Sequence, residues 1–427
     1  MLSMVRADGT AEREVLALLR SRSGEVDRQV TAVVTDIIDC VRRDGDAALA
    51  RYAQQFDGAA PPSLEVPRAQ IDAALSQADP GFVQALRRAQ ENIAAFHARQ
   101  KQQSFVDLQP NGVILGQRVR GLHRVGLYVP GGTAAYPSSV LMNAVPAKIA
   151  GVGELIMVTP PGKTGAANPD ILAAAAIAGV DRVFLTGGAQ AVAALAYGTE
   201  TIPRVDKIVG PGNIYVATAK KLLYGQVDID MIAGPSEILV VADQTADPTY
   251  LAADLLSQAE HDRLASSILL CTDEAVAQNT VREIERQTQS LSRRQIIRQA
   301  LEDFGAVILC QDFAQMVALA NEIAPEHLEL MIQNPLEAVS AFDNAGSIFL
   351  GRYSPEPLGD YYAGPNHVLP TGGTARFFSP LSVDSFVKRS SFLYYTQDAL
   401  RQAAADIVTI AEKEGLTAHA NAITVRF

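Results

Sequence analysis

The sequence predicts an α/β protein built from two parallel-sheet units, with a helical N-terminal region and a C-terminal arm. Three observations support this fold class. Short apolar segments alternate with helical periodicity between residues 124 and 236, and a second series of the same kind begins at Glu237. About 100 mostly helical residues precede the first series. A chain of 427 residues is too long for one compact core, which predicts two to four domains.

The N-terminal region is predicted to be helical in three stretches. Residues 10–22 form a short amphipathic helix, and residues 27–56 carry valine and isoleucine at helical spacing over one or two long helices. Residues 68–103 are helical again, with a break at the turn signal Asp79-Pro80-Gly81. The first convincing sheet segment follows at residues 112–120.

Both α/β units show the strand–helix alternation that is typical of a parallel sheet with right-handed crossovers. In the first unit we expect strands at 124–129, 154–159, 182–185 and 207–209, separated by helices at 136–150, 169–178, 190–196 and 213–223. In the second unit we expect strands at 237–242, 267–270, 306–309 and 347–350, separated by helices at 249–261, 274–286 and 312–323.

The expected domains follow these boundaries. Residues 26–124 join residues 237–380 in a first α/β domain, on which the N-terminal helices pack, and residues 125–236 form a second. The polar, Gly/Pro-rich segment 355–380 inside the first domain is expected to be an ordered functional loop. The chain ends in an arm, 381–427, whose apolar terminus indicates docking on another surface, and the N-terminal helix 1–25 is expected to pack with this arm.

Composition excludes several classes of protein. A formal net charge of −11 argues against nucleic-acid binding and leaves no basic patch for an anionic membrane. No apolar run approaches the ~20 residues of a membrane span. The three cysteines lie in separate segments without a CxxC pair, and the N-terminus has no apolar signal core, so we expect a reducing, cytoplasmic setting.

Three glycine-bearing turns follow strands and open helices within the first unit: Pro130-Gly-Gly132, Gly187-Gly188 and Gly210-Pro-Gly212. Small residues at such turns let a ligand approach the backbone N–H groups at helix N-termini. One such turn is explained by turn geometry alone. Three on the same edge of one sheet favour a ligand crevice, although no GxGxxG fingerprint identifies the ligand.

Polar residues also gather at a second set of positions. Gln258 and His261 are three residues apart at the end of a predicted helix, so they share one face and are placed to hold one ion. Glu326-His327 supplies two groups able to act as general acid or base near neutral pH. Four of the six histidines lie beside carboxylates, amides or turn residues, and a mixture of imidazole, carboxylate and amide ligands suits Zn²⁺. These four are His261, His327, His367 and His419, whereas His97 and His123 are interpreted as structural. The residues alone therefore indicate a metal-assisted enzyme.

Several motifs, in order along the chain, resemble the signature segments of the histidinol dehydrogenase family, and the resemblance runs from about Val30 to the C-terminus. They are RRDGDAAL (42–49), YVPGG (128–132), GGAQAVAALAYGT (187–199), VGPGN (209–213), AGPSE (233–237), SQAEHD (257–262), APEHLEL (324–330), LGDYYAGPNHVLPTGGTAR (358–376) and LTAHANAIT (416–424).

The resemblance implies two incomplete Rossmann-like domains, a C-terminal dimerisation arm and a homodimer. It also implies a zinc- and NAD-dependent oxidation of L-histidinol through L-histidinal to L-histidine, with two NAD⁺ reduced and water consumed. One Zn²⁺ per subunit is then expected on Gln258, His261, Asp360 and His419, with His419 supplied by the partner subunit.

The resemblance also assigns roles to individual residues. His327 is expected to serve as acid–base group in both half-reactions, and Glu326 to activate the water that adds to the aldehyde. His367 is given a supporting role. The expected NAD contacts are Tyr128, Gln190 and Asn213. The expected substrate contacts are Ser236, Gln258, His261, His327, Asp360, Glu414 and His419.

Three other functions stay open at this point. The first is a zinc hydrolase in which Glu326 activates a metal-bound water. The second is a non-enzymatic metal-binding or structural protein, which would have no need of Glu326-His327. The third is a dehydrogenase of a related amino alcohol, because selectivity depends on the shape of a pocket.

Overall fold

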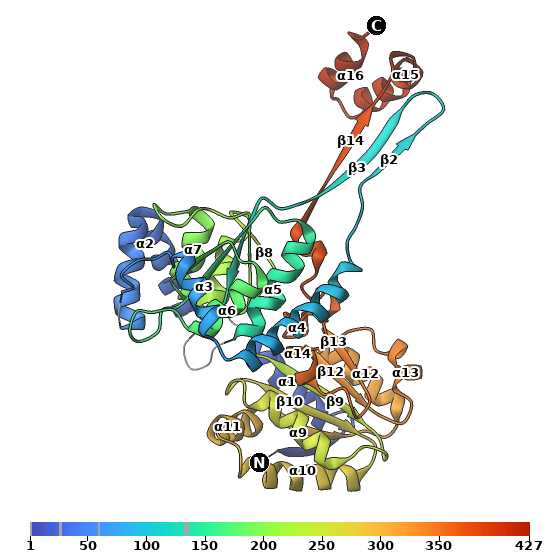
Figure 1. Cartoon of the computed structure of the whole chain (residues 1–427). Helices are drawn as coiled ribbons and strands as arrows, with labels where there is room; N and C mark the ends of the chain where they lie inside the picture. Colours follow the sequence, from blue (N-terminus) through green and yellow to red (C-terminus); the bar gives the residue numbers. More distant parts are fainter. Residues whose placement is uncertain (1, 25–27, 59, 132–135) are drawn as a thin grey trace.

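Two α/β domains and a long arm make up the protein in the computed structural model, which describes residues 2–24, 28–58, 60–131 and 136–427 (Figure 1). One domain contains a six-stranded parallel sheet with the order β1-β11-β10-β9-β12-β13. The strands are β1 Ser3–Arg6, β9 Glu237–Ala242, β10 Ser266–Cys271, β11 Gly305–Leu309, β12 His327–Met331 and β13 Ser347–Leu350. Its helices are α1 Ala11–Gly24, α9 Pro248–Ala259, α10 Glu274–Thr288, α11 Arg294–Phe304, α12 Phe313–Ile323, α13 Pro335–Ala338 and α14 Glu356–Tyr361.

The other domain contains a five-stranded parallel sheet with the order β6-β5-β4-β7-β8. The strands are β4 Arg124–Tyr128, β5 Glu154–Thr159, β6 Arg182–Leu185, β7 Lys207–Val209 and β8 Asp228–Ile229. The helices that follow these strands are α5 Pro137–Ala150, α6 Pro169–Ala178, α7 Gly188–Tyr197 and α8 Ile214–Leu223. The central strands of both sheets are buried on both faces, as continuous apolar runs require.

The two sheets share one winding pattern. Apart from the edge strand β1, the first strand of each sheet is central, the next two extend to one side, and the chain then returns to the other side for the last two. This reversal makes a switch point between β4 and β7 in one sheet and between β9 and β12 in the other. The predicted pair of Rossmann-like domains is therefore confirmed, and β1 adds a sixth strand that the sequence analysis missed.

The N-terminal helices do not pack where we expected. Helices α2 (Arg28–Tyr52), α3 (Arg68–Gln77) and α4 (Pro80–Ala98) cover the five-stranded domain rather than residues 237–380. Val34 and Ile37 of α2 join Phe184 and Val192 in one apolar core. The expectation was wrong because an amphipathic helix shows that one face is buried but does not show which sheet buries it.

The first residues belong to the six-stranded domain. β1 pairs in parallel with β11, and Leu16 of α1 is buried against that sheet. Arg13 of α1 forms an ion pair of 2.6 Å with Glu322 of α12. The N-terminal segment is thus tied to this domain, and not to the arm of its own chain as we expected, since that arm extends away from it (Figure 1).

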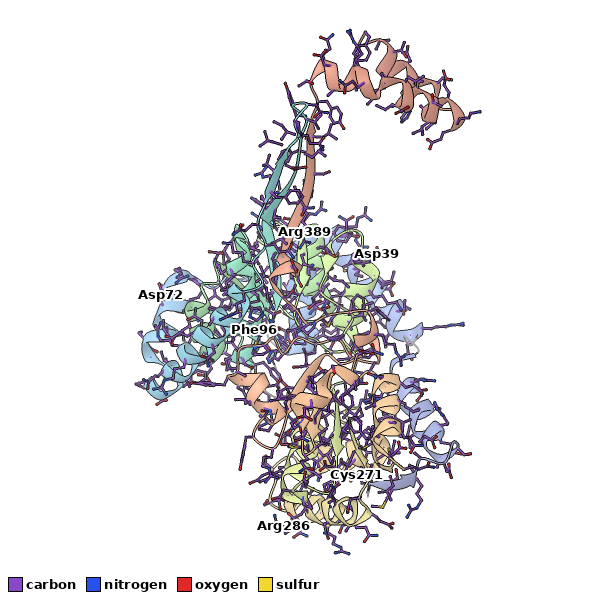
Figure 2. The ribbon with its side chains drawn as sticks, turned by 90° about the vertical axis from the view of Figure 1, so that its right-hand side faces the viewer. Asp39, Asp72, Phe96, Cys271, Arg286 and Arg389 are labelled. Carbon is purple, nitrogen blue, oxygen red and sulfur yellow. The ribbon has the colours of Figure 1, made fainter. Side chains whose placement is uncertain are left out.

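The arm is a three-stranded antiparallel sheet capped by two helices (Figures 1 and 2). The predicted tail helices are present as α15 (Gln397–Lys413) and α16 (Thr417–Thr424). The strands, in sheet order, are β14 Val387–Tyr394, β3 Ile114–Gly121 and β2 Phe105–Leu108. Residues 105–121 were expected in the first α/β domain, and this expectation was wrong. β3 pairs with β14, more than 260 residues later, and such long-range pairing leaves no local signal.

The histidine at position 97 is structural, as its sequence context predicted. Its side chain is fully buried in α4, and Nδ1 donates to the carbonyl oxygen of Ile93 at 2.8 Å. Nε2 accepts a hydrogen bond from Asn366, which also donates to the Met142 carbonyl oxygen in α5. Burial lowers the pKa of His97 below its ordinary value of 6.5. Neutral His97 therefore contributes stability that is complete above pH 6.5 and is lost as the pH falls toward the folded-state pKa.

Replacing His97 by Asn is expected to flatten the pH dependence of stability below about pH 6.5. One such group contributes at most ~1.4 kcal/mol per pH unit to the slope of the unfolding free energy. Urea unfolding at a series of pH values measures that slope. His123→Asn is the control, because His123 is exposed, and a wild-type slope in His97→Asn would contradict the assignment.

No helix in the described part of the chain is both long enough and apolar enough to cross a membrane.

Candidate active site

The predicted acid–base pair lies at the amino edge of the six-stranded sheet. His327 is the first residue of β12, where it stands opposite Ile238 of β9 and Ser347 of β13. Both Glu326 and His327 are buried. β12 was not predicted from the sequence because its apolar pattern is interrupted by Glu329, which is itself buried in the strand.

The imidazole of His327 has one nitrogen engaged and one unpaired. Nδ1 lies 2.9 Å from the carbonyl oxygen of Glu237, which only accepts, so Nδ1 carries the proton. Nε2 is therefore the basic nitrogen, and it has no hydrogen-bond partner among the described residues. It lies 3.9 Å from Asp360 and 4.0 Å from Glu356. Burial lowers the pKa of His327 to about 4, which keeps the ring neutral at neutral pH.

Glu326 is held by the main chain of Glu237, the residue that also binds His327. Its Oε2 accepts the N–H of Glu237 at 2.9 Å and lies 3.7 Å from Nδ1 of His327. Burial raises the pKa of Glu326 well above its ordinary value, and the neighbouring carboxylates add to the rise. Glu237 thus orients both members of the pair through its main chain. Ser236, a predicted substrate contact, immediately precedes it and accepts the N–H of Ser266 through its carbonyl oxygen.

Gln258 and His261 lie at the same edge, at the end of α9. Gln258 is fully buried, and neither atom of its amide has a hydrogen-bond partner in the described part of the chain. The helix ends at Ala259, so His261 lies just beyond it and donates its N–H to the carbonyl oxygen of Gln258. The two residues are adjacent as expected, but they do not share a helix face, because the helix ends before His261.

A cluster suited to a metal ion is formed by His261, Glu356 and Asp360, whose ligand atoms lie within 4.8 Å of one another. Oε1 of Glu356 is buried without a partner among the described residues, as is the amide of Gln258. Unpaired polar atoms in a protein interior are rare, and a bound ion is one of the partners that can satisfy them. Imidazole nitrogen with carboxylate and amide oxygens suits Zn²⁺, so the residues present fit that ion.

Glu356 is a member of the site that sequence reasoning missed. It begins α14, a short helix within the segment expected to be a loop, and its backbone N–H donates to Glu329 at 2.8 Å. Burial, followed by the charge of Asp360, raises the pKa of Glu356 to about 8. Burial also raises the pKa of Asp360 to about 6. The sequence held one signal for Glu356. It lies four residues before Asp360, a spacing that places the two carboxylates on one helix face.

His367 connects this site to the other domain. Its Nδ1 donates to the carbonyl oxygen of Asp360 at 3.0 Å, so its Nε2 accepts from the hydroxyl of Ser139 in α5 at 3.2 Å. Burial lowers the pKa of His367 to about 4. The predicted functional loop is therefore ordered, and it joins the amino edge of the six-stranded sheet to the first turn of α5 in the five-stranded domain.

The three predicted NAD contacts lie along the carboxyl edge of the five-stranded sheet. Tyr128 ends β4 at the switch point, and its hydroxyl accepts the N–H of Gly188, the first residue of α7, at 3.0 Å. Gln190 is buried in α7, and Asn213 caps α8 by accepting two backbone N–H groups. Gly210 has φ +112° and approaches the backbone of Tyr128 so closely that a Cβ would overlap it. Residues 132–135 of the first glycine turn lie outside the described residues.

Two predicted site residues lie far from this cluster. Glu414 and His419 are exposed on the helical cap of the arm, which extends away from both domains of its own chain (Figure 1). The structure of one chain therefore does not bring them to the site.

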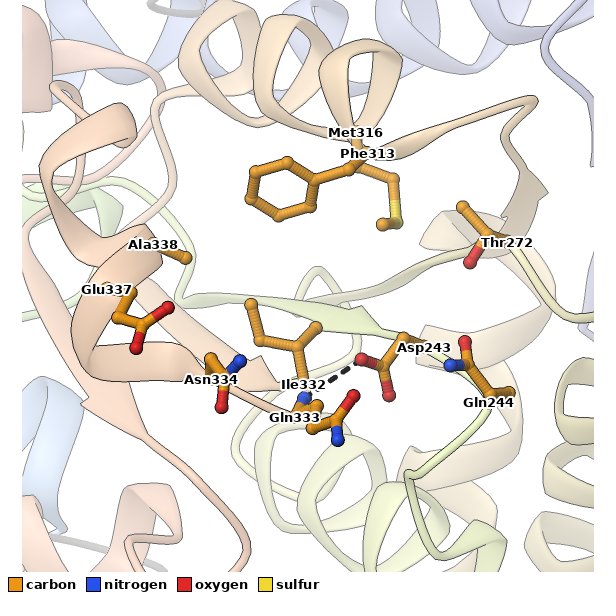
Figure 3. Close-up of a pocket in the computed structure, with 10 residues that line it drawn as sticks. All are labelled: Asp243, Gln244, Thr272, Phe313, Met316, Ile332, Gln333, Asn334, Glu337 and Ala338. Atoms are coloured by element: carbon orange, nitrogen blue, oxygen red, sulfur yellow. Dashed lines mark hydrogen bonds between the residues drawn. The ribbon is translucent and has the colours of Figure 1, made fainter.

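A cavity of about 460 Å³ lies at the opposite, carboxyl edge of the six-stranded sheet, beside the switch point (Figure 3). Asp243 on its wall accepts hydrogen bonds from the main chain and hydroxyl of Thr245 and from the N–H of Gln333. Its lining thus offers carboxylates that are either already paired, as Asp243 is, or exposed, as Glu337 is. The unpaired buried groups named above, Gln258, His327 and Glu356, are at the amino edge instead.

The fold and the site together define an α/β enzyme in which the buried pair Glu326-His327 stands beside a donor cluster suited to a metal ion. Residues 20–427 match the family model of histidinol dehydrogenase. A histidinol dehydrogenase from Clostridium acetobutylicum is 57% identical over 421 residues, and one from Listeria innocua is 54% identical over 419 residues, each match covering 98% of both chains. The crystal structure of histidinol dehydrogenase from Elizabethkingia anophelis superposes with a TM-score of 0.93 at 38% identity, covering 100% of this chain and 98% of that one.

The chain therefore belongs to the histidinol dehydrogenase family. This confirms the resemblance seen in the sequence motifs and the predicted enzyme class, a dehydrogenase.

Proposed function

We propose that the protein oxidises L-histidinol through L-histidinal to L-histidine, reducing two NAD⁺ and consuming one water, as the last step of histidine biosynthesis. The observation that carries the proposal is the neutral, buried His327 with an unpaired Nε2 next to the donor cluster. An alcohol oxidation needs a base for the hydroxyl proton where hydride leaves the carbon, and this nitrogen is such a base.

His327 serves both half-reactions in this proposal. It takes the hydroxyl proton of the alcohol at Nε2, while its Nδ1–H stays bound to the Glu237 carbonyl oxygen and holds the ring in place. His327 returns its proton to the aldehyde oxygen while Glu326 takes a proton from the water that adds there. His327 then takes a hydroxyl proton of the resulting hydrate as hydride passes to the second NAD⁺. Holding the reactive aldehyde in one site for both steps would prevent its loss to side reactions.

We propose that Gln258, His261 and Asp360 hold zinc, together with His419 of the partner subunit, and that Glu356 stands beside them. A bound zinc ion would act as a Lewis acid that orients the substrate through the substrate's imidazole and amino nitrogens. It would not carry electrons, because Zn²⁺ has no redox chemistry of its own. The support is the buried Gln258 amide, which has no partner among the described residues, together with the His261, Asp360 and Glu356 ligand atoms, which lie within 4.8 Å of one another. Ser236 and the partner's Glu414 complete the predicted substrate contacts.

For NAD we propose a site at the carboxyl edge of the five-stranded sheet, with contacts from Tyr128, Gln190 and Asn213. Support comes from the position of Tyr128 at the switch point, where open α/β sheets bind ligands. The close approach at Gly210 keeps the edge free of side chains there.

A homodimer is proposed because the arm exposes a large apolar surface. Leu108, Leu393, Ile410 and Val425 are each at least 60% exposed on the arm. Apolar surface on such an extended element is characteristic of an interaction site. A partner that covers it would gain Glu414 and His419 at its own active site, in keeping with a two-fold, self-complementary interface.

Absorbance at 340 nm tests the function. With histidinol, NAD⁺ and Zn²⁺ we expect two NADH per histidinol, loss of activity on chelation, and recovery on zinc addition. Absence of NADH would favour the zinc hydrolase, and a preference for another amino alcohol would reassign the substrate.

Replacing Glu326 by Gln is expected to slow mainly the aldehyde half-reaction, by roughly 10²-fold or more, because the amide accepts the same backbone N–H but cannot deprotonate water. Stoichiometry should then fall from two NADH toward one, with histidinal accumulating. Measuring each half-reaction separately checks this, with histidinal supplied directly for the second. Equal slowing of alcohol oxidation would refute the assigned role.

A further inference from the structure

An ion pair buried behind the acid–base pair links it to the N-terminal helix. Nη2 of Arg22, near the end of α1, lies 2.5 Å from Oε1 of Glu237, and the side chains are 2% and 10% exposed. Arg22 also donates to the carbonyl oxygen of Leu264 and lies over the ring of Phe304. Burying an arginine side chain is costly unless its charge is paired, and Glu237 supplies that pairing.

Glu237 uses all of its polar groups at the site. Its N–H donates to Glu326, its carbonyl oxygen accepts from His327, and its second carboxylate oxygen accepts the N–H of Gly372 in the functional loop. A change in the placement of Glu237 therefore moves both catalytic groups together. Arg22 holds the end of this side chain.

Charge supports the same conclusion. Three carboxylates face Glu326, and the negative charge of each disfavours the ionised form of Glu326. They are Glu237, Glu356 and Asp360. Arg22 is a cation whose charge interacts with both Glu237 and Glu326. If Arg22 were absent, Glu237 would be a buried carboxylate without its counterion, next to the group that must accept a proton from water.

We propose that Arg22 and Glu237 form a positioning pair through which the N-terminal helix holds Glu326 and His327 in their working arrangement. Arg22 does not touch the reacting atoms in this proposal; it acts through Glu237. The inference rests on the proposed function, because it assigns a support for the residues that carry out those steps.

Arg22→Met tests the pair. It keeps an apolar stem over Phe304 and removes the charge, and we expect roughly 10-fold slower aldehyde oxidation with little change in KM for histidinol, within the range known for contacting charged groups. Arg22→Lys should recover part of the rate, because it restores a positive charge without the planar fork of donors. Arg13→Met is the matched control on the same helix, since Arg13 pairs with Glu322 at the surface.

The double variant Arg22→Met/Glu237→Gln tests whether the unpaired carboxylate of Glu237 is what disturbs Glu326 and His327 in Arg22→Met. It has no uncompensated buried carboxylate at position 237, and its backbone still contacts Glu326 and His327, so it should be faster than Arg22→Met alone. A double variant no faster than Arg22→Met, or an equal loss in Arg13→Met, would overturn the proposal. A fully active Arg22→Met would do the same. If the wild type itself forms no NADH from histidinol in this assay, the proposed function fails instead.

Discussion

Replacing His327 by Asn is expected to lower the rates of both half-reactions by roughly 10²–10⁴-fold, the usual contribution of general acid–base catalysis. The Asn amide can still donate to the Glu237 carbonyl oxygen, as Nδ1 does in the wild type. It has no basic nitrogen to replace Nε2, so the hydroxyl proton of the alcohol and that of the aldehyde hydrate both lose their acceptor. Single-turnover measurements of NADH formation from histidinol and from histidinal determine the two losses.

Zinc content should stay at the wild-type level in His327→Asn, because His327 is not among the proposed ligands. His123→Asn is the control for replacing a histidine, since His123 is exposed. Wild-type turnover of histidinol by His327→Asn would refute the role of His327. Loss of zinc together with activity would move His327 from the acid–base pair into the metal site.

Mixing two inactive variants is expected to restore activity if the site is shared between subunits. His419→Ala lacks a proposed ligand on the arm, and His327→Asn lacks the base in the core. In a hybrid dimer one site combines an intact core with an intact arm, whereas the other site carries both defects. Random exchange of subunits at equal concentrations should therefore give roughly a quarter of wild-type activity, since half of the dimers are hybrids with one working site each.

The recovery is measured after the two proteins are dissociated and reassembled together. Each variant treated alone in the same way is the control and should stay inactive. Absence of recovery, with hybrid dimers demonstrated by mass, would show that His419 does not complete the site of its partner. This test addresses the arm directly, because the structure shows His419 exposed and far from the core of its own chain.

Local patterns accounted for much of the fold. The strands from Arg124 to Leu350 were expected close to their observed bounds, except β8 and β12, because a strand buried on both faces is a continuous apolar run. The break near Pro80 and the two tail helices were also predicted, since their signals lie within a few residues. Besides β8 and β12, the strands that were not predicted are β1 and the arm strands β2 and β14. They form only through partners more than 250 residues away or on an exposed hairpin.

The sequence by itself determined the family, the two parallel-sheet domains and the identity of the groups able to do chemistry, because these are written in motifs and short periodicities. Only the tertiary structure decided which of those groups meet. It placed Glu326, His327 and Gln258 at the amino edge of one sheet, added Glu356 to the cluster, and buried Arg22 of the N-terminal helix behind Glu237. The reason is that burial, tautomer and charge depend on neighbours distant in the chain, and neither residue type nor spacing specifies those neighbours.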